Sequence, residues 1–261
     1  MKLKLLFIGI LVFTLVSCGE YEKILKSTDY ILKYKKAFEY YNNEEYTRAA
    51  NLFDQIVGVF RGTTKSDTVS YYQAMSYYKQ KDFIMSGHYF KTFFETYPYS
   101  NFAEEAEYLS AYCYYLNSPP PALDQENSTI AIESFQSFVN KFPGSKHVLE
   151  SKECITELQD KLVEKSKLNA VLYYDLGVYK SSIIALKNSL AEYPNTKYRE
   201  ELMWLVLDSN YQLAKGSIES KKRDRFQTTL DEYYSFITEF PKSKYKKKAE
   251  DIYETAGKMV K

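Results

Sequence analysis

The feature that most limits the fold of this 261-residue chain is a short segment that recurs four times. In each copy an aromatic residue precedes a proline, and a serine or threonine follows two residues after the proline. The copies are Tyr97-Pro98 with Ser100, Phe142-Pro143 with Ser145, Tyr193-Pro194 with Thr196, and Phe240-Pro241 with Ser243. Proline disfavours helical backbone in the residue before it, and a hydroxyl side chain can accept an amide proton at the start of the next helix. The pattern therefore predicts helix ends separated by equivalent turns.

Small and aromatic residues recur at fixed distances before these turns, and an additional segment ends at Phe60-Arg61-Gly62 without the proline. The recurring positions are Ala37, Tyr40, Tyr46, Ala49, Phe53 and Ile56, then Ala74, Tyr77, Phe83, Ser86, Phe90 and Phe93, and later Ala170, Tyr173, Gly177, Tyr179, Ser182 and Leu186. Small residues let the two helices of a hairpin approach closely, and rings fill the space between stacked hairpins. The spacing resembles the tetratricopeptide pattern. It predicts an all-α fold, a tetratricopeptide-like helical-hairpin solenoid of about five repeats.

The repeat domain is expected over residues 29–261, with N-terminal repeats at 29–143 and C-terminal repeats at 144–261. A longer helix at about 146–165 is expected between the third and fourth repeats, and a charged connector at 215–224 in the fifth. The third repeat carries an insertion, Asn117–Asn127, with three consecutive prolines that favour a stiff, extended loop. Long loops in compact domains often carry function. The insertion is therefore either a contact surface or an exposed spacer.

The N-terminus has the form of a lipoprotein signal. Lys2 and Lys4 precede a short apolar stretch, and the small residue Ser17 stands directly before Cys18. We expect residues 1–17 to be a signal peptide, Cys18 to be lipidated, and residues 18–28 to be a lipid-anchored linker. The alternative is an ordinary signal peptide with an incidental cysteine. No aspartate follows Cys18, which favours the periplasmic face of the outer membrane.

Composition excludes several functions. Without Lys2 and Lys4 the chain has 33 Lys and Arg against 34 Asp and Glu, so a nucleic-acid partner is not expected. Cys113 and Cys154 are expected as buried free thiols, although a pairing between them stays open, and no CxxC spacing suggests a metal site. No phosphate loop, metal-binding pair or nucleophile motif is present. We therefore expect a non-enzymatic protein without cofactors or metals.

Helical repeats offer a concave groove, lined by the first helix of each hairpin, that can hold a peptide or a partner helix. The 27 tyrosines fit this use, because tyrosine combines a large contact area with a polar group. For any single tyrosine, filling the space between repeats is the alternative. The basic runs at 221–225 and 242–248 indicate either solvated faces or contacts with an acidic surface or lipid headgroups.

Three blocks make the chain similar to the BamD (ComL) family of lipoproteins. They are Asn42–Tyr46 with Ala49 and Phe53, Phe93–Pro98 with Phe102–Ala106, and Tyr173–Tyr179 running to Tyr193–Thr196. The resemblance implies a scaffold of the outer-membrane β-barrel assembly machinery. Its partners would be the POTRA domains of a BamA-like barrel protein and unfolded outer-membrane proteins.

The resemblance also implies site residues. Tyr34, Phe38 and Tyr72 would belong to a groove for the C-terminal strand signal of barrel substrates. Tyr41 is added to this groove because it flanks the core positions of the first repeat. Asn210 and Tyr211 would lie on the side that contacts BamA. The main alternative is another periplasmic tetratricopeptide lipoprotein, such as a secretin pilot or a cell-envelope scaffold, with the same groove and a different partner.

Overall fold

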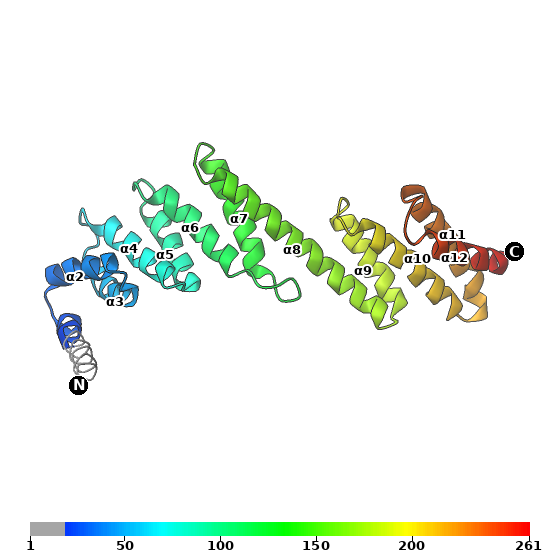
Figure 1. The fold of residues 1–261 in the computed structure, drawn as a ribbon, viewed down its shortest axis with the longest axis horizontal. Helices are drawn as coiled ribbons and strands as arrows, with labels where there is room; N and C mark the ends of the chain where they lie inside the picture. The colour runs from blue at the N-terminus through cyan, green and yellow to red at the C-terminus, as the bar shows by residue number, and fades with distance from the viewer. Residues whose placement is uncertain (1–18) are drawn as a thin grey trace, which may run out of the picture. The chain divides into compact units, whose positions relative to one another are not determined.

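The structure is a computed structural model that describes residues 19–261, and every regular element in that range is an α-helix (Figure 1). The all-α prediction is confirmed. The predicted signal peptide and Cys18 lie outside the described residues. The chain divides into two compact units. The N-terminal unit contains residues 19–119 and Gln125–Leu158, and the C-terminal unit contains Pro120–Asp124 and Gln159–Lys261.

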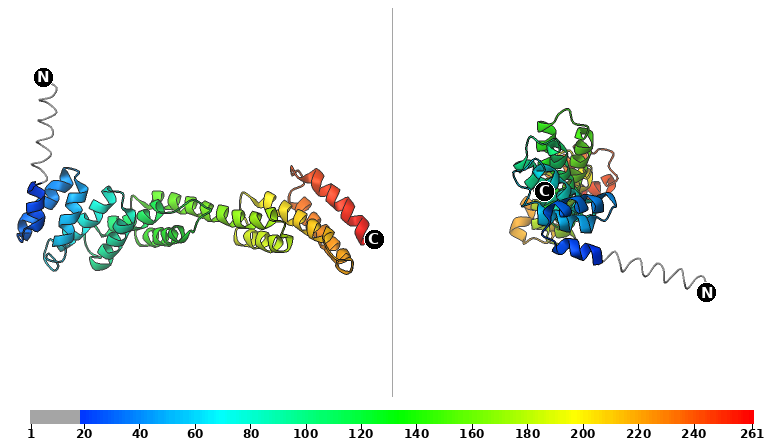
Figure 2. Two further views of the ribbon diagram at one scale, coloured as in Figure 1. Left: turned by 90° about the horizontal axis from the view of Figure 1, so that it is seen from below. Right: turned by 90° about the vertical axis from the view of Figure 1, so that its left-hand side faces the viewer.

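The N-terminal unit consists of a helix at 19–26 followed by three hairpins. The hairpins are α2 (Tyr30–Asn42) with α3 (Tyr46–Ile56), α4 (Ser66–Lys79) with α5 (Phe83–Thr96), and α6 (Ala103–Leu116) with α7 (Glu126–Lys141). The first part of α8 (Val148–Asp175) closes this unit. Consecutive helices from α2 to α7 pack against each other, as two views show (Figure 1, Figure 2).

The C-terminal unit starts with the second part of α8, which forms a hairpin with α9 (Tyr179–Glu192). It continues with α10 (Arg199–Lys215), α11 (Glu219–Glu239) and α12 (Lys246–Val260). α10 contacts α9, α11 and α12. Residues 30–260 therefore form five hairpins and a last single helix, as predicted for a tetratricopeptide-like solenoid.

The turns between repeats have one geometry, which accounts for the recurring sequence segment. At each turn the backbone amide of the hydroxyl residue donates to the carbonyl of the aromatic residue three positions earlier, at 3.0–3.1 Å. Its hydroxyl accepts a proton from the amide two positions later, at 3.0–3.3 Å. Thr63, after Phe60, makes the same two bonds although its turn lacks the proline. The hydroxyls were predicted to cap the next helix, and this is wrong in detail. The donating amide belongs to the residue just before the helix, and no side chain caps α4, α6, α10 or α12.

The two units have different cores. Phe90, Phe93, Phe135 and Phe138 are fully buried in the N-terminal unit, while Leu186, Leu202, Leu207 and Phe236 fill the C-terminal unit around Trp204. Small residues allow the close helix contacts. A Cβ atom added to Gly87 on α5 would lie 3.0 Å from Cys113 Cβ on α6. Cys113 and Cys154 are buried free thiols, as expected.

α8 differs from the prediction of a helix at 146–165, because it continues without interruption through the first helix of the fourth repeat. No glycine or proline occurs between Val148 and Asp175, so nothing in this stretch ends the helix. The division between the two compact units falls at Leu158, within α8, and Pro120–Asp124 belongs to the C-terminal unit. There, Lys165 Nζ donates to Leu123 O at 2.6 Å. The expected connector at 215–224 is also shorter, because α11 begins at Glu219.

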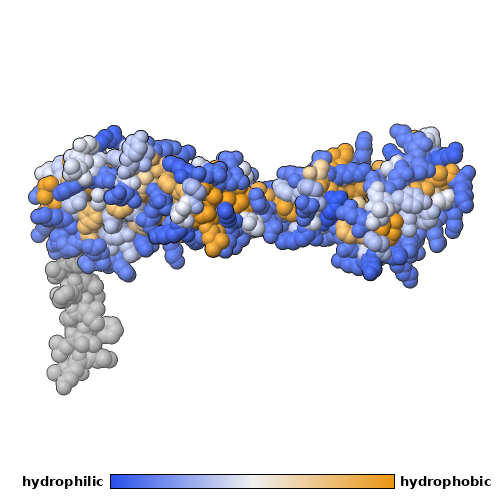
Figure 3. Space-filling model, turned by 90° about the horizontal axis from the view of Figure 1, so that it is seen from above, coloured by the Kyte–Doolittle hydropathy of each residue, from blue (hydrophilic) through white to orange (hydrophobic). Residues whose placement is uncertain are grey.

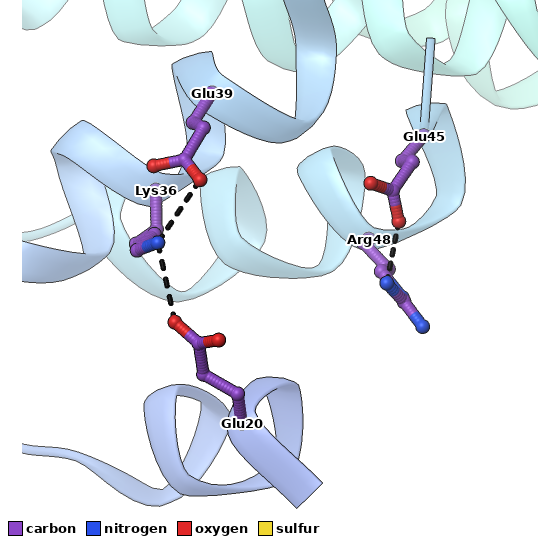
Figure 4. Close-up of polar contacts among 5 residues, drawn as sticks. All are labelled: Glu20, Lys36, Glu39, Glu45 and Arg48. Carbon is purple, nitrogen blue, oxygen red and sulfur yellow. Dashed lines mark hydrogen bonds and ion pairs between the residues drawn. The ribbon is translucent and has the colours of Figure 1, made fainter. Parts of the chain in front are cut away.

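Most of the predicted linker at 18–28 is helical, and the helix at 19–26 packs on the first hairpin. Ile24 is only 5% exposed and belongs to the core of this hairpin. Lys36 Nζ lies 3.3 Å from a Glu20 carboxylate oxygen and 3.0 Å from one of Glu39 (Figure 4). The buried Lys33 donates to Leu25 O at 3.1 Å and so binds the negative end of the helix dipole. These contacts hold the segment on the repeat domain.

Candidate functional site

The four residues predicted to line a substrate groove form one cluster. Tyr34, Phe38 and Tyr41 follow one face of α2, and Tyr72 reaches them from α4. Ring centroids are 4.9 Å apart for Tyr34–Phe38, for Phe38–Tyr72 and for Tyr41–Tyr72. We call these four residues the α2–α4 aromatic cluster. Since α2 and α4 are the first helices of two consecutive repeats, the cluster crosses a repeat boundary.

The cluster rests on buried rings. Phe53 from α3 is fully buried and meets Phe38 edge to face at 5.1 Å, and Phe60 lies 5.3 Å from Tyr34. The four cluster rings are themselves only partly buried. Packing against Phe53 and Phe60 restricts the rotamers of the cluster rings. Part of each ring is therefore presented to solvent in a fixed position. Tyrosine presented in this way gives contact area at a low cost in side-chain entropy.

The electrostatics of the cluster are set by the partly buried phenol of Tyr41 and by one neighbouring cation, Lys65. Burial raises the pKa of Tyr41 to about 12, and the nearby Tyr72 and Tyr46 hydroxyls contribute further. Tyr41 is therefore protonated at neutral pH. Lys65 Nζ lies 4.4 Å from the centroid of the Tyr34 ring, within the range of a cation–π contact. This surface can receive apolar and aromatic side chains and can hydrogen-bond to a peptide backbone.

A cleft beside the cluster was not predicted. The turn that carries Lys65 lies next to the turn after α5, and together they form a cleft of about 410 Å³. Hydroxyl groups dominate its lining, with Thr63, Ser66, Tyr97 and Ser100 among them, and Asp67 is its only acidic residue. Ser66 Oγ and the Tyr97 hydroxyl are 2.6 Å apart. These hydroxyl residues are visible in the sequence. That they line one cleft could not be predicted, because the two turns that carry them come together only in the folded repeats.

The two residues predicted for partner binding have different environments. Asn210 is buried, and its Nδ2 donates to Val206 O at 2.8 Å within α10. It lies inward because α9, α11 and α12 all contact α10. Asn210 therefore supports the helix and is not a surface contact. Tyr211 is partly exposed, packs 6.3 Å from Phe226, and has Lys215 Nζ 5.1 Å from its ring centroid.

The described residues 19–261 contain no group of three or more His, Cys, Asp or Glu side chains that could hold a metal ion. Of the two histidines, His147 stacks on Tyr108 at 3.9 Å with nearly parallel rings, which is a packing contact. Within the same range, no helix combines the length and the apolar character needed to cross a membrane.

The five hairpins of the described residues 19–261 define a tetratricopeptide-like repeat protein with a half-buried aromatic cluster on its first repeats. The family described as YfiO, outer membrane lipoprotein, matches residues 29–175 and again 163–259. The chain therefore belongs to this family of outer membrane lipoproteins.

A curated relative agrees with this assignment. The chain is 28% identical over 122 residues to the outer membrane protein assembly factor BamD of Neisseria gonorrhoeae. The aligned stretch is 47% of this chain and 42% of the relative, so the chain matches less than half of the relative's length. The predicted resemblance to the BamD family is confirmed.

Proposed function

We propose that this chain is a lipid-anchored, non-catalytic scaffold that assists the assembly of β-barrel proteins at the periplasmic face of the outer membrane. Membership of a family of outer membrane lipoproteins and similarity to an assembly factor support this role. The observation that carries the proposal is the α2–α4 aromatic cluster, because it joins two consecutive repeats into one half-buried surface. Cys18 would carry the lipid, and several acyl chains would make the anchoring firm.

In this proposal the cluster binds the extended C-terminal segment of an unfolded barrel protein. Apolar side chains of the segment would contact the exposed parts of Tyr34, Phe38 and Tyr72, and the neutral phenol of Tyr41 would hydrogen-bond to its backbone. Binding should be of modest affinity, because ordering a disordered segment costs conformational entropy. Modest affinity suits a scaffold that has to release its substrate.

The C-terminal repeats would hold a BamA-like barrel protein through its POTRA domains. Tyr211 remains a candidate contact there, since it is partly exposed and lies beside Lys215. Asn210 would act only by keeping α10 in shape. One chain would then bind its substrate with the first repeats and its partner with the last ones.

Peptide binding can be tested on the purified chain with a synthetic peptide of about ten residues from the C-terminus of a barrel protein of the same organism. Tyr34→Ser should weaken binding about tenfold, because one of the four rings of the cluster is lost. Tyr30→Ser is the matched control, since Tyr30 lies on the same helix outside the cluster. Equal affinities of the two variants would contradict the proposal.

The assembly role can be tested by purifying the tagged protein from gently solubilised outer membranes and identifying co-eluting proteins by mass spectrometry. Near-stoichiometric recovery of a barrel protein with POTRA domains is expected, with a reduced yield for Tyr211→Ser and an unchanged yield for the exposed control Tyr234→Ser. Cys18→Ala should release the protein from the membrane. Recovery of a secretin or of cell-wall enzymes without the barrel protein would favour the alternative envelope scaffold.

A further inference from the structure

The first repeats of the two units correspond residue by residue at a constant offset. Ala37 corresponds to Ala170, Tyr46 to Tyr179, Phe53 to Leu186 and Phe60 to Tyr193, and the members of each pair are 133 residues apart. The structure supports the register, because Phe60 and Tyr193 accept the same turn bond from Thr63 and Thr196. The outer face of α2 and α3 can therefore be compared with that of α8 and α9.

In the N-terminal unit this outer face is covered by the helix at 19–26. Tyr40 is only 7% exposed and lies 5.6 Å from Tyr21, edge to face. Asn51 Nδ2 donates to the Tyr21 hydroxyl at 3.0 Å, and Ile24 is buried beside Tyr40 in the same core cluster. The first repeat of this unit thus receives its outer layer from a segment outside the repeats.

In the C-terminal unit the corresponding residues are exposed. Tyr173, the counterpart of Tyr40, is 42% exposed, and Ile184, the counterpart of Asn51, is 55% exposed. Three further apolar residues, Leu172, Leu176 and Val178, are exposed at positions where the N-terminal unit has Glu39, Asn43 and Glu45. We call Leu172, Tyr173, Leu176, Val178 and Ile184 the α8–α9 face. The α8–α9 face is more apolar than the face of α2 and α3 that the helix at 19–26 covers in the N-terminal unit.

The chemistry of the α8–α9 face indicates what fits it. Lys36, which pairs with Glu20 of the covering helix, corresponds to Asn169, and Arg48, which pairs with Glu45, corresponds to Ser181. Neither counterpart carries a charge, so no acidic contact is required of the occupant. The helix at 19–26 of a second copy would place Glu20 opposite Asn169 without a cation, which disfavours an exchange between copies.

We propose that the α8–α9 face is the docking site for a short amphipathic α-helix of a partner protein, which would lie where the helix at 19–26 lies in the N-terminal unit. The covering helix has eight residues, so two turns suffice for the partner helix. Its contact side would be aliphatic or aromatic and uncharged. Apolar side chains reach the otherwise hydrophilic surface of the molecule (Figure 3). The proposal is independent of the proposed function, because it rests on a comparison within the chain.

The test uses the full chain in the cells that produce it, with a photo-crosslinking amino acid in place of Ile184. Irradiation should join the protein to one partner, and mass spectrometry should locate the crosslink within an amphipathic helical segment. The control carries the same amino acid in place of Ile84, an exposed isoleucine on α5, and should not crosslink to that segment. A crosslink to a second copy, a crosslink to lipid alone, or no crosslink at Ile184 would overturn the proposal.

A binding measurement then tests the face itself. A synthetic peptide of the crosslinked segment should bind the purified chain, and Leu176→Asp should weaken the binding at least tenfold, whereas Ile84→Asp should leave it unchanged. Leu176 is 65% exposed, so the substitution should leave the thermal unfolding temperature nearly unchanged. Val178→Asp serves as a second variant if Leu176→Asp lowers that temperature. Equal binding by wild type and the face variants would contradict the docking site.

Discussion

In the N-terminal unit, the first helix of a repeat stacks a ring on the residue that directly precedes the first helix of the next repeat: Tyr71 on Phe102 at 4.3 Å and Tyr108 on His147 at 3.9 Å. In the C-terminal unit the corresponding contacts are Lys167 over the Tyr198 ring and Trp204 on Tyr245. The residue on the first helix can therefore be a tyrosine, a tryptophan or a lysine, and its partner can be a phenylalanine, a tyrosine or a histidine. The repeat needs a compact contact there and leaves the residue type free to vary.

The units also differ in charge. The N-terminal unit, counted from residue 19, has 14 Lys and Arg against 18 Asp and Glu, and the C-terminal unit has 19 against 16. Opposite net charges steer partners of opposite charge to the two units. One repeat geometry thus carries an acidic, aromatic unit and a basic unit with an aliphatic core.

The largest expected effect is the loss of stability when one buried side chain is truncated in the core of either unit. Phe93→Ala should destabilise the N-terminal unit by about 3–5 kcal/mol, and Leu202→Ala should destabilise the C-terminal unit by about 2–5 kcal/mol, because each leaves a cavity. Trp204 is the only tryptophan and reports on the C-terminal unit alone. In urea, Phe93→Ala should shift the circular dichroism transition without moving that of Trp204 fluorescence. An equal shift of both signals would show that the units unfold together.

Alkaline pH should also distinguish the units. Among the described residues, nine tyrosines of the N-terminal unit and four of the C-terminal unit have a raised pKa, mostly through burial. Burial disfavours the tyrosinate, so the resulting stability is complete below pH 10 and is lost between pH 10 and about 12, the pKa of Tyr41 and Tyr78. Circular dichroism should therefore change at a lower pH than Trp204 fluorescence. The reverse order would contradict this interpretation.

A smaller effect is expected from opening the covered face. Ile24→Asp should remove about 1.5–3 kcal/mol of apolar burial and release the helix at 19–26 from α2 and α3. Hydrogen exchange should show loss of protection at 19–26 while α4 and α5 stay protected. Ile184→Asp is the matched control at an exposed position and should change stability by less than about 0.5 kcal/mol.

The smallest effect concerns the shared turn. Ser100 Oγ donates to Asp67 at 2.8 Å, and Ser243 Oγ donates to Glu200 at 2.6 Å, while each hydroxyl also accepts from the amide two residues later. Ser100→Ala and Ser243→Ala should each cost about 1 kcal/mol in the free energy of unfolding, because each removes the hydrogen bonds of one hydroxyl. Chemical denaturation measures both variants. Losses that differ by more than twofold would show that the turns are not energetically equivalent.

The parts of the fold that were predictable from sequence are those in which one residue type has a local effect. Proline after an aromatic residue ends a helix, and the small residues Ala37 and Ala49 mark the helix contact where both are fully buried. The aromatic cluster was placed through the family resemblance, and the structure brings its four rings together.

The parts that were missed depend on contacts distant in sequence. The helix at 19–26 is held by contacts with Lys33, Lys36 and Asn51. The sequence of the segment itself does not indicate these partners. Asn210 could not be recognised as buried, because its position depends on three helices that surround α10. The α8–α9 face is exposed because no described helix covers it in the way that the helix at 19–26 covers α2 and α3. The periodic sequence pattern is the same in both repeats and does not show this difference.

The docked helix at 19–26 also determines how much flexible chain lies between a lipid on Cys18 and the first repeat. A flexible linker of ten residues would let the domain move over about 15–20 Å. Here residue 19, the neighbour of Cys18, already belongs to the docked helix, so a lipid on Cys18 would be separated from the first repeat by almost no flexible chain. The aromatic cluster would then meet its ligands in a thin layer at the bilayer surface. Within that layer, encounter frequency would depend on lateral diffusion in two dimensions.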